Sequence, residues 1–261
     1  MSEPLVCAIM LTKDRPEMAR RAVESFRAQT YWNKCLFVLA DSPATAPATD
    51  MMRGEFLAIL SHSYVPRSIG SLRNLAVSGA AGQFKPDIFI HFDDDDYSHP
   101  SRIEEQVAHL QSSGADVVGF NELLFWREGV QLRPDPSYEW DRAAGEAWLY
   151  KHRTNAPGTT LCYWRKTFER KPFPDLNNGE DYHWLQGLKV AAVPGFGIAN
   201  LEVEPNLKGR TFGDYFQPRM IASIHGGNTL PYDIEGQIER GSREWKRIPN
   251  YDAYCSERLK L

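Results

Sequence analysis

Apolar and polar residues follow two distinct periodicities along the first half of the chain. Continuous apolar runs of strand length occupy residues 5–11, 35–40, 56–60, 87–92 and 116–120. Between them, apolar residues recur at helical spacing in residues 12–30, 70–82 and 99–114. Strands that are apolar throughout and alternate with amphipathic helices are typical of a parallel sheet covered on both faces. The pattern therefore predicts an α/β fold with a Rossmann-like, mostly parallel central sheet flanked by helices.

The periodicity weakens after residue 120. Residues 121–155 are rich in aromatic side chains, and a long irregular segment of this kind is either a functional lid or an insertion with a small core of its own. Further strands are expected at 159–164 and 191–195, with a helix beginning near Glu180 between them.

The tail is rich in glycine, proline and tyrosine, which predicts an irregular C-terminal arm with one helix around residues 234–245. We therefore expect a domain of residues 1–203, in two halves of about 1–120 and 121–203. An arm or lid of residues 204–261 would follow it.

Composition and charge exclude only a few classes of function. The chain has 261 residues, enough for one large domain or two small ones, and a formal net charge of −4 at pH 7. So small a charge implies neither a nucleic acid nor an acidic membrane as a partner. No apolar stretch approaches the roughly 18 residues that span a bilayer, and the N-terminus lacks a signal sequence. The sequence thus predicts a cytoplasmic protein.

The cysteines indicate no metal or disulfide framework. The four residues, Cys7, Cys35, Cys162 and Cys255, form no Cys-x-x-Cys pair, and the first three lie in apolar runs. Buried free thiols are the expected outcome.

Four consecutive aspartates, at 93–96, follow the apolar run that ends at residue 92. A surface loop would let water compensate their mutual repulsion, but a turn needs one aspartate and not four. The carboxyl ends of parallel strands form the ligand-binding edge of such a sheet, and Thr12 and Asp41 follow strands in the same way. We therefore expect the repulsion to be offset only when a cation and a substrate arrive together.

Carboxylate oxygens at this edge favour Mg²⁺, Mn²⁺ or Ca²⁺ over zinc. The spacing of Asp93, Asp95 and Glu104 matches an EF-hand loop, but Ser98 replaces its glycine and Pro100 interrupts it. A Mn²⁺ or Mg²⁺ ion held by one or two carboxylates, with phosphate oxygens completing its shell, fits better. This implies a substrate that carries a diphosphate.

Five stretches, in order along the chain, resemble family 2 glycosyltransferases of the GT-A fold. They are CAIMLTKDRPEMARRAVESFRAQTYWN, FVLADSP, the Arg-Asn helix GSLRNLAVSGAAG, the D-x-D segment IFIHFDDDDYSHPSRI, and APGTTLCYWRKTF followed by NNGEDYHWL. The likeness runs from about residue 5 to 193, with a fainter echo to about 229. It implies transfer of a sugar from a nucleotide-diphosphate sugar, with UDP the expected nucleotide, to an acceptor hydroxyl. Residues 1–120 would be the nucleotide-sugar half and 121–203 the acceptor half.

The resemblance also implies roles for residues at the donor end. Asp41 would accept a hydrogen bond from the nucleotide base, and Thr12 and Arg15 would line the same pocket. Asp93 and Asp94 would contact the ribose. Arg73 would pair with the diphosphate or the aspartate cluster, with a helix-surface ion pair as the alternative. Asp95 would hold the metal and His225 would add a metal or diphosphate ligand, although a lone histidine is more often structural. Asp96 would support the loop, so that Asp95→Ala should harm activity most and Asp96→Ala least.

For the acceptor hydroxyl, the resemblance implies Asp181 as general base, with Glu180 orienting it or binding acceptor. Acidic residues at a helix N-terminus can also be purely stabilising. One base and direct displacement mean inversion at the anomeric carbon.

Several alternatives stay open on the sequence. A nucleotidyltransferase of related sheet architecture and a non-catalytic carbohydrate-binding protein are the competing functions. The acceptor is unidentified; a saccharide is expected, and a lipid-linked one would need peripheral membrane contact. The sequence also leaves a homodimer open.

Overall fold

The computed structural model describes residues 3–40, 57–61, 67–127, 145–151, 156–198, 216–224 and 234–259. Its larger sheet has seven strands in the order β10-β6-β9-β4-β1-β2-β3. Their bounds are β1 Val6–Thr12, β2 Lys34–Ala40, β3 Leu57–Ser61, β4 Ile88–His91, β6 Val117–Phe120, β9 Cys162–Trp164 and β10 Val190–Val193. All neighbours are parallel except at β9, which is antiparallel to β4 and β6. The predicted mostly parallel α/β sheet is confirmed.

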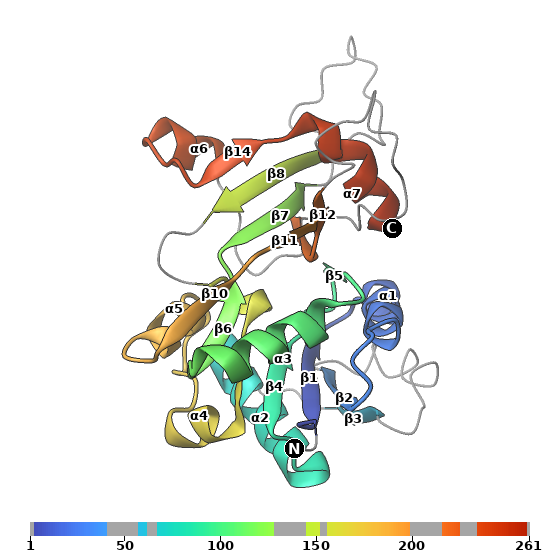
Figure 1. Ribbon diagram of the computed structural model, residues 1–261, viewed down its shortest axis with the longest axis vertical. Coiled ribbons are helices and arrows are strands. Elements are labelled where there is room, and N and C mark those ends of the chain that lie inside the picture. Colours follow the sequence, from blue (N-terminus) through green and yellow to red (C-terminus); the bar gives the residue numbers. More distant parts are fainter. Residues whose placement is uncertain are drawn as a thin grey trace.

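Helices cover both faces of this sheet (Figure 1). They are α1 Pro16–Arg27, α2 Ile69–Phe84, α3 Arg102–Ser113, α4 Arg165–Arg170 and α5 Glu180–Leu185. Alternate residues of β1 point to opposite faces, so Ala8 and Met10 pack with α1 and α3 while Cys7 and Ile9 pack with α2 and α5. The apolar core therefore lies in two layers, one on each side of the sheet.

The reversed direction of β9 has a consequence for the site. Because β9 is antiparallel, the residues that precede it lie at the carboxyl ends of its neighbours β4 and β6. These residues form a short 3-10 helix, η3, at Gly158–Thr160. The aspartates follow the carboxyl end of β4, so η3 and the aspartate cluster share one edge of the sheet.

A second sheet of five strands, in the order β14-β8-β7-β13-β5, lies above this edge (Figure 1). Its strands are β5 Tyr97–Ser98, β7 Glu122–Arg127, β8 Glu146–Lys151, β13 Met220–Ile224 and β14 Trp245–Arg247. Around it lie β11 Phe196–Ile198 paired with β12 Phe216–Pro218, α6 Ile234–Glu239, the 3-10 helix η5 Pro249–Tyr251, and α7 Asp252–Arg258. The strand β5 comes directly after the aspartates, so both sheets meet at the cluster.

The described part of the C-terminal arm, residues 216–224 and 234–259, holds more regular elements than the one expected helix. One helix was expected around residues 234–245, whereas α6 ends at Glu239 and β14 and α7 follow. The strand β13 pairs with β7 from the aromatic-rich segment, and both contribute to a separate apolar cluster with α7. The described part of residues 121–155 thus packs into a core with the arm.

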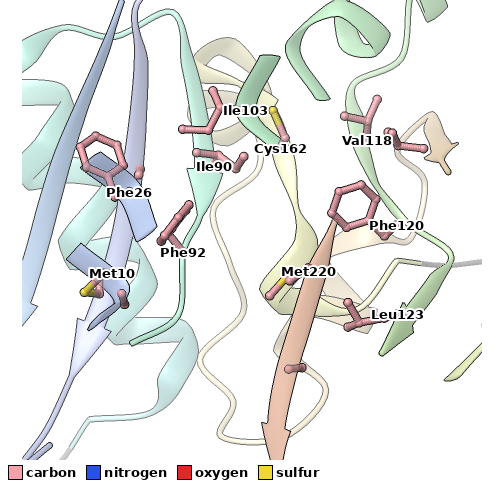
Figure 2. Close-up of a cluster of buried hydrophobic side chains, with 14 of the residues drawn as sticks. Met10, Phe26, Ile90, Phe92, Ile103, Val118, Phe120, Leu123, Cys162 and Met220 are labelled. Carbon is pink, nitrogen blue, oxygen red and sulfur yellow. The ribbon is translucent and has the colours of Figure 1, made fainter. Parts of the chain in front are cut away.

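The two sheets also share apolar packing. Figure 2 shows Met10, Phe92 and Ile103, which lie in the apolar layer beside α1 and α3, in one cluster with Phe120 of β6 and Met220 of the second sheet. This continuity fixes the second sheet over the carboxyl edge of the first. Among the described residues, no helix combines the length and apolar character needed to cross a membrane.

Candidate functional site

A cavity of about 410 Å³ lies at the carboxyl edge of the larger sheet. Its lining includes Arg15, Arg73, all four aspartates of the cluster, and both Glu180 and Asp181. The second sheet supplies the opposite side through residues of β7, β8, β13 and β14. The structure therefore brings together, in one cavity, residues that are distant in the sequence and that were predicted to act together.

Arg15 compensates two of the aspartates. Its guanidinium lies 2.7 Å from Asp94 Oδ1 and 2.9 Å from Asp95 Oδ2. Asp95 is the donor-side residue assigned to the metal, and Arg15 was assigned to the nucleotide pocket. The expectation that the repulsion is offset only by an arriving cation and substrate is therefore wrong, because the chain supplies a cation of its own.

Asp94 is the most deeply buried of the four, with 1% of its surface exposed. Burial raises the pKa of Asp94 to about 7, the charge of Asp95 adds to this rise, and Arg15 opposes it. A hydrogen bond from the hydroxyl of Thr12, which ends β1, also opposes this rise of the pKa. A carboxylate with these two partners can still accept further bonds at the cavity wall.

Asp96 links the aspartate loop to two other elements of the structure, η3 and β13. Its carboxylate accepts a hydrogen bond from Thr159 Oγ1 at 2.5 Å and from the Ser223 backbone N–H at 3.0 Å. Burial raises the pKa of Asp96 well above its usual range. These contacts join the aspartate loop to η3 and to β13.

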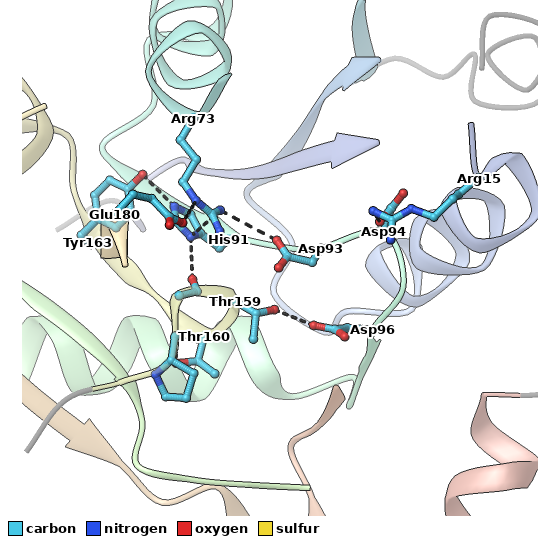
Figure 3. A network of polar contacts seen from close by, with 12 residues as sticks. Arg15, Arg73, His91, Asp93, Asp94, Asp96, Thr159, Thr160, Tyr163 and Glu180 are labelled. Atoms are coloured by element: carbon cyan, nitrogen blue, oxygen red, sulfur yellow. Dashed lines mark hydrogen bonds and ion pairs between the residues drawn. The ribbon is translucent and has the colours of Figure 1, made fainter. Parts of the chain in front are cut away.

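Arg73 lies at the centre of a buried network (Figure 3). Its Nε is 3.1 Å from Glu180 Oε1, and its Nη1 is 3.9 Å from Asp93 Oδ1. The Arg73 side chain is only 8% exposed, so its ion pairs do not lie on the helix surface. Its contact with the aspartate cluster is the one with Asp93. Burial raises the pKa of Glu180, and the Arg73 charge opposes that rise.

His91, the last residue of β4, belongs to the same network, and it is the buried, hydrogen-bonded histidine that its alternation with the apolar residues of the strand predicts. Its Nδ1 lies 2.6 Å from the Gly158 carbonyl oxygen and 3.0 Å from Arg73 Nη1, and its Nε2 lies 3.3 Å from the Tyr163 hydroxyl. These partners favour the tautomer in which Nδ1–H donates to Gly158. Burial lowers the pKa of His91 well below its usual range, and Arg73 lowers it further. A polar residue inside the apolar run 87–92 was the available signal, since a buried polar group needs a partner.

Asp181 is positioned by close contact with η3. A Cβ added to Gly158 would lie 2.6 Å from Asp181 Oδ2, so only glycine leaves room for the carboxylate there. The other oxygen accepts a hydrogen bond of 2.7 Å from the Tyr182 backbone N–H. Through Gly158, the candidate base is therefore linked to His91 and β4.

Arg102, whose role was missed, is fully buried beneath the aspartate loop. Its guanidinium donates to the carbonyl oxygens of His91 and Thr159 and to the Ser98 hydroxyl, at 2.7, 2.9 and 2.8 Å. Burial lowers the pKa of Arg102 to about 10. This side chain ties together the two ends of the aspartate segment and η3.

Two predicted residues, Asp41 and His225, lie outside the described residues. Tryptophan side chains could stack on sugar rings, but Trp126, Trp148 and Trp184 are buried in the core. The basic residues of 165–171 lie at a surface edge, where Arg165 pairs with Glu169 and Arg170 with Asp116.

Solved structures with the same fold are GT-A glycosyltransferases. S. aureus TarS 1-349 in complex with UDP matches at a TM-score of 0.54 and 17% identity, over 84% of this chain and 60% of that chain. The mannosyltransferase PcManGT from Pyrobaculum calidifontis, in complex with GDP-Man and Mn²⁺, matches at 0.55 and 13% identity, over 100% of this chain and 71% of that chain. The present chain spans 36% of a longer TarS chain. At identities this low, the structural likeness shows the fold alone, which is GT-A.

The family is established by sequence. The family model described as Glycosyl transferase family 2 matches residues 7–170, more than half of the chain. The chain belongs to this family, and the resemblance seen in its motifs is confirmed. No curated protein sequence matches it significantly.

Proposed function

We propose that this protein is a metal-dependent, inverting glycosyltransferase that uses a nucleotide-diphosphate sugar, with a UDP-sugar as the expected donor. The observation that carries the proposal is the shared cavity, which is lined by both the aspartate cluster and the Glu180–Asp181 pair. Transfer needs a place for the diphosphate and a base for the acceptor within reach of one anomeric carbon.

The donor would lie at the aspartate end of the cavity. Asp93 and Asp94 are assigned to the ribose, with Thr12, Arg15 and Asp41 around the base and Arg73 close to Asp93. In support, TarS 1-349 was solved with UDP-GlcNAc, at a TM-score of 0.55 and 16% identity, and PcManGT with GDP-Man.

The donor set near Asp95 fits a hard divalent cation. Within the described ranges, no group of three acidic, histidine or cysteine residues is placed to hold an ion, but Mg²⁺ and Mn²⁺ need only one or two carboxylates when phosphates complete the shell. Asp95 would hold the ion, the buried oxygens of Asp94 offer further acceptor capacity, and His225 is the additional ligand that the sequence predicts. The ion would supply positive charge that stabilises the departing nucleoside diphosphate.

Asp181 would accept the proton of the acceptor hydroxyl. Of the two acidic residues that begin α5, Glu180 is held by Arg73 at 3.1 Å and is 8% exposed, so it is poorly available to a substrate. Asp181 is partly exposed and lines the cavity. Direct attack by the activated hydroxyl on the anomeric carbon, opposite the departing diphosphate, inverts its configuration.

A donor-release assay tests the proposal. The full chain is incubated with Mn²⁺ and a panel of UDP-sugars and GDP-mannose, and nucleoside diphosphate is measured with water or saccharides as acceptor. We expect release that requires the metal and falls in Asp181→Asn, and a product whose anomeric configuration is opposite to the donor's by NMR. Release of pyrophosphate from UTP or GTP in the presence of a sugar phosphate would instead indicate a nucleotidyltransferase, and failure to bind any nucleotide sugar would refute transfer altogether.

A cytoplasmic location belongs to the proposal as well. Fractionation of cells that express the full chain tests it, and retention in washed membranes would contradict it. Light scattering on the purified protein distinguishes a monomer from a homodimer.

A further inference from the structure

The cavity has a second half whose chemistry differs from that of the aspartate end. Its lining includes Phe125, Tyr150 and Trp245 from the second sheet. These three rings pack against one another at centroid distances of 4.6 to 5.8 Å. Amide side chains accompany them, with Gln237 accepting a hydrogen bond from Trp245 Nε1 at 2.8 Å. Aromatic faces with a few amides form the kind of surface that binds an uncharged, hydroxyl-rich ring.

The charges of the described lining residues disfavour an anionic occupant in this half. Among these residues, the basic side chains are Arg15 and Arg73, and both pair with carboxylates at the other end. Burial and the charges of Glu244 and Asp181 raise the pKa of Tyr150, so Asp181 borders the aromatic half and would repel a phosphate or carboxylate. A neutral saccharide avoids this repulsion.

Tyr182 lies between this half of the cavity and solvent. It lines the cavity and is 52% exposed, whereas the three aromatic residues of the opposite wall are mostly buried. Its backbone N–H donates to Asp181 Oδ1 at 2.7 Å, which orients the carboxylate of the candidate base beside the tyrosine backbone. Single exposed aromatic residues are common on protein surfaces, but this one adjoins the group assigned to the acceptor's proton.

We propose that Tyr182 is the platform on which the face of an uncharged saccharide acceptor stacks, so that it determines acceptor specificity. The inference rests on the transfer proposed above and names the acceptor class of the same site. The C–H face of the sugar covers the tyrosine ring, and a hydroxyl at the sugar's edge then reaches the adjacent carboxylate. Removing the ring should weaken saccharide binding about tenfold, or about 1.4 kcal/mol.

A glycan array tests the platform across many candidate acceptors at once. The full chain is applied with Mn²⁺ and UDP to neutral oligosaccharides and to sialylated, uronate-bearing and phosphorylated ones. We expect neutral glycans to bind to wild type and Tyr182→Phe, and to bind about tenfold more weakly to Tyr182→Ala. Trp32→Ala is the matched control, since Trp32 is 72% exposed and is not among the residues that line this cavity; its binding should equal wild type.

Separate calorimetry with UDP-sugars and GDP-mannose distinguishes this inference from the proposed function. Preference for anionic glycans, binding of no glycan, or unchanged binding by Tyr182→Ala would overturn the platform even if nucleotide sugars bind. An equal loss of glycan and nucleotide-sugar affinity in Tyr182→Ala would also overturn it, because that pattern indicates general damage. Glycan binding that depends on Tyr182, without any nucleotide-sugar binding, would support the platform and refute the transferase.

Discussion

Replacing Gly158 by alanine tests whether the position of the Asp181 carboxylate sets the transfer rate. Gly158 lies in η3 without a positive φ, so alanine meets no backbone strain there. The new Cβ would lie 2.6 Å from Asp181 Oδ2, whereas ordinary contact begins at 3.4 Å. The carboxylate must therefore move by about 0.8 Å, because η3 is held by His91 and Arg102 and cannot yield easily. A displacement near 1 Å lowers the rate of a reaction about 10²-fold, equivalent to about 2.7 kcal/mol of activation free energy.

The assay is nucleoside diphosphate release with Mn²⁺ and the best donor, with water or saccharide as acceptor. We expect kcat to fall about 10²-fold while donor affinity, measured by calorimetry, stays within about twofold, since Gly158 faces Asp181 and not the aspartate cluster. Gly82→Ala is the matched control: a Cβ there has no neighbour within 4 Å, and alanine favours its helix. A Gly158→Ala protein that folds normally and keeps its kcat within about twofold would refute the assignment of Asp181 as the base.

Three further perturbations follow from the same contacts. Asp96→Ala should lower the free energy of unfolding by about 2–4 kcal/mol, since it strands the Thr159 hydroxyl and the Ser223 N–H; urea denaturation measures this, and an unchanged midpoint contradicts it. The contribution of His91 to stability should be lost as pH drops below about 6.5, because unfolded His91 binds a proton that the folded residue, with its lowered pKa, does not, whereas the raised pKa values of Asp94 and Asp96 act in the opposite direction. The slope of stability against pH should therefore be more positive in wild type than in His91→Gln, by up to about 1.4 kcal/mol per pH unit, and equal slopes in the two proteins would disprove it. Finally, Arg15→Gln should tighten Mn²⁺ binding in the absence of nucleotide, since Arg15 now pairs with two carboxylates; calorimetry that finds equal or weaker binding contradicts this.

The sequence predicted those elements whose residues have only one favourable environment. The run 5–11 is apolar throughout, so it could only be a strand buried on both faces, and β1 is that strand. Helix α3 was expected to end at Gly114, and Gly114 does adopt the left-handed conformation at its C-cap. Such local constraints act within a few residues and can therefore be recognised without the fold.

Non-local pairing could not be recognised in this way. The run 159–164 has the composition of any buried strand, and nothing in it specifies that β9 lies antiparallel between β4 and β6. The pairing of β13 with β7 joins residues about 100 positions apart, and it depends on sheet edges that exist only once the fold has formed.

The same division applies to the site. The cluster Asp93–Asp96 was identified because an uncommon concentration of charge needs compensation wherever it lies, and Glu180–Asp181 because their segment resembles the family's motif. His91 was expected to be buried and hydrogen-bonded, but its partner Gly158 could not be named, and Arg102 was missed, because partners such as Gly158 and Thr159 come close only in three dimensions. Gly158 has no side chain, so its importance shows only when its neighbour Asp181 is seen.

The compensation of the aspartates has a consequence for donor binding. Arg15 pairs with both Asp94 and Asp95 in this structure, and it is also a cation at the end of the cavity assigned to the diphosphate. If Arg15 turned to the diphosphate, the two carboxylates would lose their counter-charge, and Asp94 is too buried for water to replace it. A divalent cation restores the balance, so cation and diphosphate should each strengthen the binding of the other, by the same factor. The four aspartates thus couple two ligands through one arginine, and Arg15→Gln should reduce that coupling.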